Sequence, residues 1–147
     1  MVITYYGLSC FKVESGKLVL AFDPPSKESE IKPPRFACQV VLSSHDHPRH
    51  NGAKELAGEP FIISGPGEYE TKGLMINGWP SFHDGVRGQK RGLNTIYTVE
   101  MEEMRLCHLG DLGTTELDGP TLEAIGEVDI LFVPTGGEDV LGPEEAR

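Results

Sequence analysis

The chain has 147 residues, a formal net charge of −10 and a hydrophobic fraction of 38%. This length suits one domain with one core, which we expect to span residues 1–147. The acidic charge argues against a nucleic-acid partner, and no apolar run is long enough to cross a membrane. The cysteines Cys10, Cys38 and Cys107 form no Cys-x-x-Cys pair. They argue against a disulfide framework and indicate the reducing cytoplasm.

The first third of the chain is rich in short apolar runs. Four strands are predicted there, at Val2–Tyr6, Phe11–Val13, Lys17–Phe22 and Gln39–Ser43. The second and third flank a turn at Glu14-Ser15-Gly16 and therefore predict a hairpin. The polar, proline-rich stretch 26–35 predicts an exposed loop.

Later segments mix strands with two short helices. The helices are expected at Asn51–Gly58, where the glycine ends the helix, and at Pro120–Ile125. Further strands are expected at Pro60–Ile63, Leu74–Ile76, Thr95–Val99, Arg105–His108 and Asp129–Val133. This order is neither a regular βαβ alternation nor an all-β pattern. Two packed sheets with peripheral helices are the best layer solution.

The last seven residues, 141–147, resemble the start of a helix. Pro143 stands early, and Glu144 and Glu145 fill the first turn, where the helix dipole favours them. One turn of helix is not stable by itself. We therefore expect a chain that is truncated, or that a partner completes; a frayed acidic tail is the alternative.

Three of the five histidines, His45, His47 and His50, follow the predicted strand at Gln39–Ser43. Residues two apart at a strand end point to the same side, so His45 and His47 can reach one ion. Beyond the bend, His50 can face the same cavity from another direction. Zinc prefers imidazole nitrogen and carboxylate oxygen in a compact geometry. Two histidines cannot complete a tetrahedron, so more distant ligands are required, with His83, His108 and the aspartates as candidates.

The segment Ser44-His45-Asp46-His47-Pro48-Arg49-His50 resembles the His-x-His-x-Asp-His motif of the metallo-β-lactamase superfamily. Further segments match in order: Phe22-Asp23-Pro24, Gly65–Glu70, Cys107–Gly113 and Val128–Gly137. The last three resemble the branch of predicted zinc-dependent hydrolases related to ascorbate-phosphate lactonases. This resemblance covers the whole chain. It implies an α+β fold, an αββα sandwich with metals at one edge between the sheets, here with its C-terminal part missing.

The resemblance also implies roles for individual residues. The metal ligands that it implies are His45, His47, His83, Asp111 and His50. Of these, His50 belongs to the second metal, and Asp111 bridges both metals. Asp23 and His108 are expected to support the ligands without touching an ion.

Two departures from the family pattern weaken the second metal site. Arg49 stands where the motif has an aspartate that binds the second metal and orients the attacking water, and arginine cannot ligate a cation. The family's last histidine lies beyond the point where this chain ends. We therefore expect one zinc ion, with manganese or iron as alternatives. Asp46 is expected to point away from the metal, while Arg49 could pair with Asp111 or with a substrate anion.

Three functions stay open. The first is a metal-dependent hydrolase of an ester, lactone or phosphate-containing small molecule, with Asp111 and Arg49 acting in catalysis on a metal-activated water. The second is a degenerate, non-catalytic member that binds metal or ligand without turnover, which Arg49 and the early stop favour. A nuclease-like member acting on RNA fits the acidic charge least. If the chain is truncated, exposed strand edges would favour a homo-oligomer.

Overall fold

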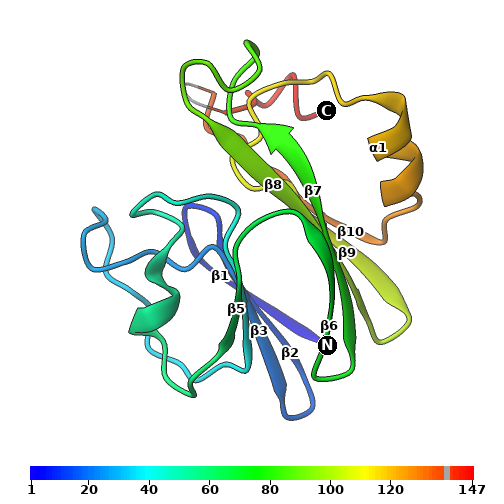
Figure 1. The fold of residues 1–147 in the computed structure, drawn as a ribbon. Coiled ribbons are helices and arrows are strands. Elements are labelled where there is room, and N and C mark those ends of the chain that lie inside the picture. The colour runs from blue at the N-terminus through cyan, green and yellow to red at the C-terminus, as the bar shows by residue number, and fades with distance from the viewer. Residues whose placement is uncertain (138–139) are drawn as a thin grey trace.

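The computed structural model describes residues 1–137 and 140–147 of the chain. Two mixed five-stranded sheets face each other (Figure 1). The first has the order β1-β2-β3-β4-β5, with strands at Val2–Gly7, Cys10–Ser15, Leu18–Phe22, Val40–Leu42 and Phe61–Ile63. The second has the order β10-β9-β8-β7-β6. Its strands, from β6 to β10, are Gly67–Thr71, Leu74–Phe82, Leu93–Met101, Met104–His108 and Ile130–Phe132.

The main core lies between the two sheets. The first sheet contributes Val13, Leu20, Phe22, Val40 and Leu42, and the second contributes Ile76, Tyr97, Val99, Leu106 and Phe132. All three residues of β4 are buried. A strand with parallel neighbours on both sides must be covered on both faces, which explains its continuous apolar run.

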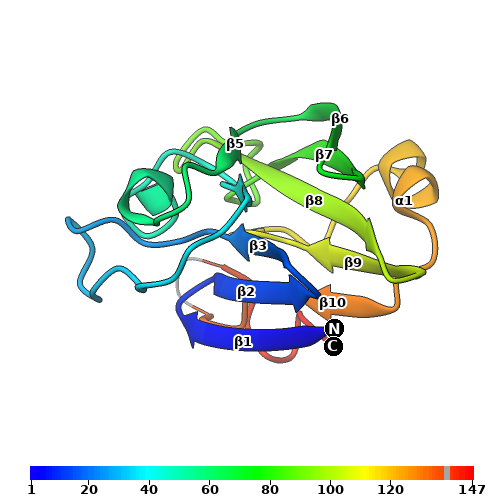
Figure 2. The same cartoon turned by 90° about the horizontal axis from the view of Figure 1, so that it is seen from below.

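Short helices cover the outer faces of the sheets. The 3₁₀ helix η1 (Gly52–Glu55) lies over the first sheet, where Ala53 packs with Ala21 and Val41. The helix α1 (Gly119–Ile125) lies outside the second sheet (Figure 2), where Ile125 packs with Ile96. The layer order is therefore helix, sheet, sheet, helix, and the predicted αββα sandwich is confirmed, with thin helical layers.

Most predicted strands are present, but four elements differ from the prediction. β6 was not predicted as a strand, and β7 continues to Phe82 instead of ending at Ile76. The helix expected at Asn51–Gly58 is only the four-residue η1, because Leu56 already has extended backbone (φ −85°, ψ 145°). Residues 141–147 form no helix but a turn closed by one bond from Ala146 N to Gly142 O, since one turn does not propagate.

The strand ends place three segments at one edge of the sandwich. These segments, 43–50, 83–92 and 109–113, follow β4, β7 and β9. Thr95 N donates to Ser44 O across the sheets, and Gly113 N donates to Phe82 O within the second sheet. Among the described residues, no helix has the length and apolarity needed to span a membrane.

Candidate metal centre

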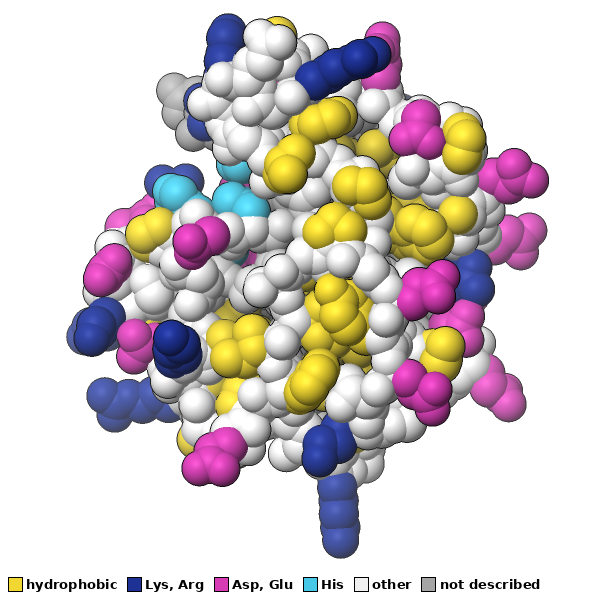
Figure 3. Space-filling view, viewed as in Figure 1, with side chains coloured by type: hydrophobic (Ala, Val, Ile, Leu, Met, Phe, Trp, Pro, Cys, Tyr) yellow, Lys and Arg dark blue, Asp and Glu magenta, His cyan; other side chains and the backbone are white. Residues whose placement is uncertain are grey.

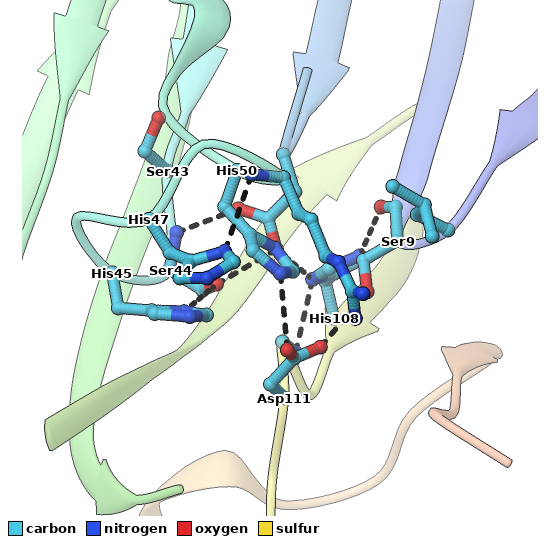
Figure 4. Close-up of polar contacts among 12 residues, drawn as sticks. Ser9, Ser43, Ser44, His45, His47, His50, His108 and Asp111 are labelled. Atoms are coloured by element: carbon cyan, nitrogen blue, oxygen red, sulfur yellow. Dashed lines mark hydrogen bonds and ion pairs between the residues drawn. The ribbon is translucent and has the colours of Figure 1, made fainter. Parts of the chain in front are cut away.

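Five potential metal donors meet at this edge of the sandwich, and His45, His47, His50 and Asp111 are labelled in Figure 4. The donor atoms of His45, His47 and His50 all lie within 4.8 Å of one another, and so do those of His45, His83 and Asp111. His45 belongs to both groups, so the five side chains form one continuous cluster. The structure thus brings together all five ligands that the sequence resemblance implies.

The histidine loop owes its shape to turns rather than to strand alternation. β4 ends at Leu42, before the first histidine. His50 N and Asn51 N both donate to His47 O, at 2.8 and 3.0 Å, and bend the chain back on itself. As a result the rings of His45 and His50 lie 4.3 Å apart between centroids. The expected convergence is present, but the reason given for it from the strand pattern was wrong.

Asp23 lies beneath this loop and fixes the ring orientation of two histidines. Its carboxylate accepts bonds from Ser44 N (2.7 Å), Ser44 Oγ (2.7 Å) and His50 Nδ1 (2.9 Å). Ser44 Oγ also lies 3.0 Å from His45 Nδ1. Because the Ser44 hydroxyl proton is given to Asp23, His45 must donate from Nδ1 to complete that bond. Both His45 and His50 therefore turn Nε2 toward the cluster, as second-layer carboxylates do for metal-binding histidines.

The two oxygens of Asp111 have different surroundings. Oδ1 accepts a hydrogen bond from Ser9 Oγ at 3.1 Å. Oδ2 lies 3.0 Å from His50 Nε2 and 3.2 Å from His83 Nε2. The His50 contact has an ion-pair distance but not the angles of a hydrogen bond, so His50 Nε2 is buried without a hydrogen-bond partner among the described residues. Nitrogens that surround one carboxylate oxygen without bonding to it fit a cation between them.

The electrostatics of the cluster favour a cation as well. Burial lowers the pKa of His50, but the neighbouring Asp23 and Asp111 outweigh this effect and raise the pKa to about 10. The contacts with His50 and His83 outweigh burial and hold the pKa of Asp111 well below its usual range. Burial and the charge on His50 lower the pKa of His45 to about 4. Without metal, the positively charged His50 ring therefore lies between two carboxylates, and the neutral His45 offers a lone pair to an ion.

His108 has no nitrogen left for a metal. Its ring stacks on Phe22 with centroids 4.7 Å apart. Nε2 donates to Ser9 O at 3.0 Å, and Nδ1 accepts from Gly110 N at 3.1 Å. These two bonds require a neutral ring, and burial lowers the pKa of His108 in the same sense. Its position beside Asp111 is that of a supporting group.

Comparison with known proteins agrees with this geometry. The family model described as the β-lactamase superfamily domain matches residues 2–147. The chain belongs to this superfamily. A UPF0173 metal-dependent hydrolase of Methanocorpusculum labreanum is 28% identical over 169 aligned positions, which cover 99% of this chain and 75% of that protein.

Solved structures give the same family. A protein of Thermotoga maritima, described as a Zn-dependent hydrolase of the metallo-β-lactamase superfamily, superposes with a TM-score of 0.79 at 35% identity. The match covers 98% of this chain and 66% of that one, so the chain spans about two thirds of that structure's length. An isothiocyanate hydrolase from Delia radicum gut bacteria matches with a TM-score of 0.71 at 13% identity, covering 97% and 77% of the chains. At that identity the likeness shows the fold alone.

The residue that departs from the superfamily motif lies at the rim of the cluster. Arg49 Nη2 pairs with Glu30 Oε1 at 2.7 Å, and both side chains are partly exposed. The pairing of Arg49 with Asp111 that the sequence left open is absent among the contacts of the described residues. Asp46 accepts a hydrogen bond from Asn51 Nδ2 and lies outside both donor groups, so it does not replace the missing aspartate.

Two clefts flank the donors. A cleft of about 650 Å³ is lined by polar residues, among them Ser9, Asp111 and Arg49, and by apolar residues, among them Tyr5, Phe11 and Phe132. A second cleft, of about 460 Å³, reaches His45 from the other side. Figure 3 shows histidine side chains at the molecular surface. A small molecule therefore has open access to the cluster.

Three residues that shape the site were not identified from the sequence: Ser9, Ser44 and Asn94. Ser9 is 102 positions from the carboxylate that it contacts, and no spacing rule connects the two. Ser44 directly precedes His45, but a serine at the end of a strand gives no sign in the sequence that it contacts a metal ligand. Asn94 offered a signal, because it is a buried polar residue in the long, mostly buried strand β8.

Proposed function

We propose that this chain is a hydrolase that uses one zinc ion, held by His45, His47, His83 and Asp111 with His50 beside them. The observation that carries the proposal is the convergence of five donors from three segments in two groups that share His45, with His50 Nε2 and His83 Nε2 beside Asp111 Oδ2. Imidazole and carboxylate donors suit zinc, and iron or manganese are the alternatives.

The chemistry divides between the ion and the chain. A bound ion supplies a lowered pKa for a water and polarisation of the substrate's carbonyl or phosphoryl oxygen. The chain orients the donors: Asp23 fixes the rings of His45 and His50, and Ser9 holds the second oxygen of Asp111. Arg49 lines the same cleft, where its guanidinium is suited to a negatively charged oxygen of the substrate.

The substrate that we propose is a small ester, lactone or phosphate-containing molecule. The larger cleft has about 650 Å³, which is within the range of small-molecule sites. Its mixture of apolar and charged lining residues fits a small molecule that carries a hydrolysable polar group. The net charge of −10 disfavours a nucleic-acid substrate. The three buried free cysteines support a cytoplasmic location. The edge strand β1 could pair with a second copy of the chain, and this is the sole basis for including a homo-oligomer in the proposal.

One observation favours a second candidate function, a member of the fold that binds metal or ligand without turnover. Arg49 replaces the motif's acid, and its charge is paired with Glu30 rather than with a donor of the cluster. A guanidinium beside the donors repels a second cation. A site reduced to one ion has no second ion to hold the leaving group.

Turnover by the zinc-loaded protein separates these two functions. Chromogenic esters, lactones and phosphate esters are offered to the wild type and to Asp111→Asn. The hydrolase proposal predicts zinc-dependent turnover of at least one class, lost in Asp111→Asn. Zinc binding with no turnover of any class, and turnover gained in Arg49→Asp, would establish the non-catalytic function instead.

A further inference from the structure

Asn94, near the start of β8, forms side-chain hydrogen bonds to three residues of the framework around the donors. The side chain is 1% exposed. Its amide nitrogen donates to Leu109 O and to Ser81 Oγ, both at 2.8 Å. Its oxygen accepts the backbone N–H of Asp111 at 3.0 Å. Both N–H donors of this buried amide are therefore used, and its oxygen accepts one bond.

These bonds link the segments that carry the donors. Leu109 and Asp111 belong to the turn that follows β9 and presents the Asp111 carboxylate. Ser81 pairs with Asn94 across β7 and β8 and stands two residues before His83. The next residue, Thr95, donates its N–H to Ser44 O, directly before His45. One two-residue step of β8 thus touches all three donor-bearing segments.

Packing in the turn depends on the same side chain. Gly110 has a φ of +60°, and a Cβ added there would overlap Asn94 Oδ1 and Ser44 Cβ. The turn of residues 109–111 therefore closes directly onto the Asn94 amide and the histidine loop. A displaced Asn94 would leave Leu109 O and the Asp111 N–H without these partners, which would destabilise the turn.

We propose that Asn94 is a positioning residue for the metal centre, which holds the Asp111 turn in register with the His83 and His45 segments. The inference rests on the proposed function, because the centre that it positions is the proposed zinc site. Asn94 itself offers no donor to the ion; it acts by aiming Asp111 Oδ2 at the point that His50 and His83 surround. Supporting groups of this kind contribute about 10- to 100-fold to metal affinity.

The test uses Co²⁺, whose visible spectrum reports the donor set, together with amide exchange of Asp111 followed by NMR. The variants are Asn94→Leu, which removes all three bonds at similar volume, and the milder Asn94→Ser. Thr98→Val is the matched control, because Thr98 is buried on the same strand and accepts one bond from Trp79 Nε1, far from the donors. Ser81→Ala removes one partner and leaves the Asp111 bond.

We expect Asn94→Leu to bind Co²⁺ about 10- to 100-fold more weakly, with an altered spectrum and faster exchange at Asp111. Ser81→Ala should lose less, and Thr98→Val should match the wild type. Co²⁺ binding and spectrum equal to those of Thr98→Val in a folded Asn94 variant would overturn the proposal. If Asn94→Leu does not fold, Asn94→Ser decides by the same criteria.

Metal uptake by the wild type distinguishes a failure of the proposed function from a failure of the role of Asn94. If the wild type takes up no Co²⁺ and no Zn²⁺, the metal centre itself is wrong. The exchange of the Asp111 amide in metal-free Asn94→Ser then decides whether Asn94 holds the turn: faster exchange than in Thr98→Val supports that role, and equal exchange overturns it.

Discussion

His50 Nδ1 lies 2.9 Å from Asp23 Oδ2, and both side chains are 1% exposed. The same aspartate reaches His45 through the Ser44 hydroxyl. A single buried carboxylate thereby sets the ring orientation of two histidines, and its neutral form could not do so.

Asp23→Asn should weaken zinc binding by about 10- to 100-fold. An amide retains the size of the carboxylate but replaces one acceptor oxygen by an NH2 donor, so it cannot accept all three bonds that Asp23 accepts from Ser44 N, Ser44 Oγ and His50 Nδ1. Calorimetric titration with zinc measures the change. Asp46→Asn is the control, because Asp46 lies between the same histidines in sequence but outside both donor groups. Equal affinities of the two variants would contradict the role of Asp23.

The metal-free protein should lose stability as the pH rises from 7.5 to 8.5. The pKa of His50 is raised from 6.5 to about 10 in the folded state. In this window the folded chain keeps a proton that the unfolded chain has released, so the free energy of unfolding falls with pH, by up to about 1.4 kcal/mol per unit. Urea unfolding of chelator-treated protein at the two pH values measures the fall.

His50→Gln provides the comparison for this pH effect. The variant has no proton to retain at that position, so its stability should change less over the same window. The buried cysteines, whose pKa values burial raises, are identical in both proteins. Parallel pH dependence of wild type and variant would show that His50 is not the group responsible.

Arg49→Asp should increase the number of ions bound. The substitution restores the acid of the superfamily motif and removes a cation that now pairs with Glu30. Arg49→Ala removes the charge without adding a ligand and separates the two effects. We expect a second ion in Arg49→Asp and not in Arg49→Ala, measured by metal analysis after equilibration with zinc. Identical metal content in all three proteins would mean that Arg49 does not limit the second site.

Gly110→Ala should destabilise the fold more than Gly16→Ala does. Both glycines have a left-handed φ, +60° and +58°, so both substitutions incur about 1–2 kcal/mol of backbone strain. Around Gly16 no atom lies within 4 Å of an added Cβ, whereas at Gly110 the Cβ would overlap Asn94 and Ser44. Thermal unfolding measures the difference. Equal losses would show that the 109–111 turn can shift without cost.

The sequence predicted the layers of the fold because they follow from local patterns. The early hairpin and the buried strand before the histidines have strong periodicity and clear turns. The strand β6 was not predicted because its centre, Glu68-Tyr69-Glu70, is polar. The second half of β7 was not predicted because Gly78 and Pro80 are typical of turns. β6 pairs with β7 only as far as Gly78, so at Pro80 the strand β7 has a neighbour on one side only, β8. Proline, which lacks an N–H, is tolerated at such an edge position.

At the site, the donors could be predicted and their supports could not. His45, His47 and His50 stand together in the sequence, and motif resemblance added His83 and Asp111. Ser9 reaches Asp111 only because the two sheets pack against each other, and Asn94 on β8 reaches it because the chain turns sharply at Gly110 after the neighbouring β9. Contacts of this kind depend on tertiary structure and leave no periodicity to detect. The ion pair between Arg49 and Glu30 could not be predicted either, because Glu30 lies in a loop without regular structure.

The most direct test of the account is the metal content of the chain, measured by elemental analysis of protein purified without chelator, with Asp111→Ala alongside. The account predicts one zinc or similar ion per chain, lost in the variant. Two ions would contradict the argument from Arg49. No metal after reconstitution, or equal metal in the variant, would contradict the proposed centre itself.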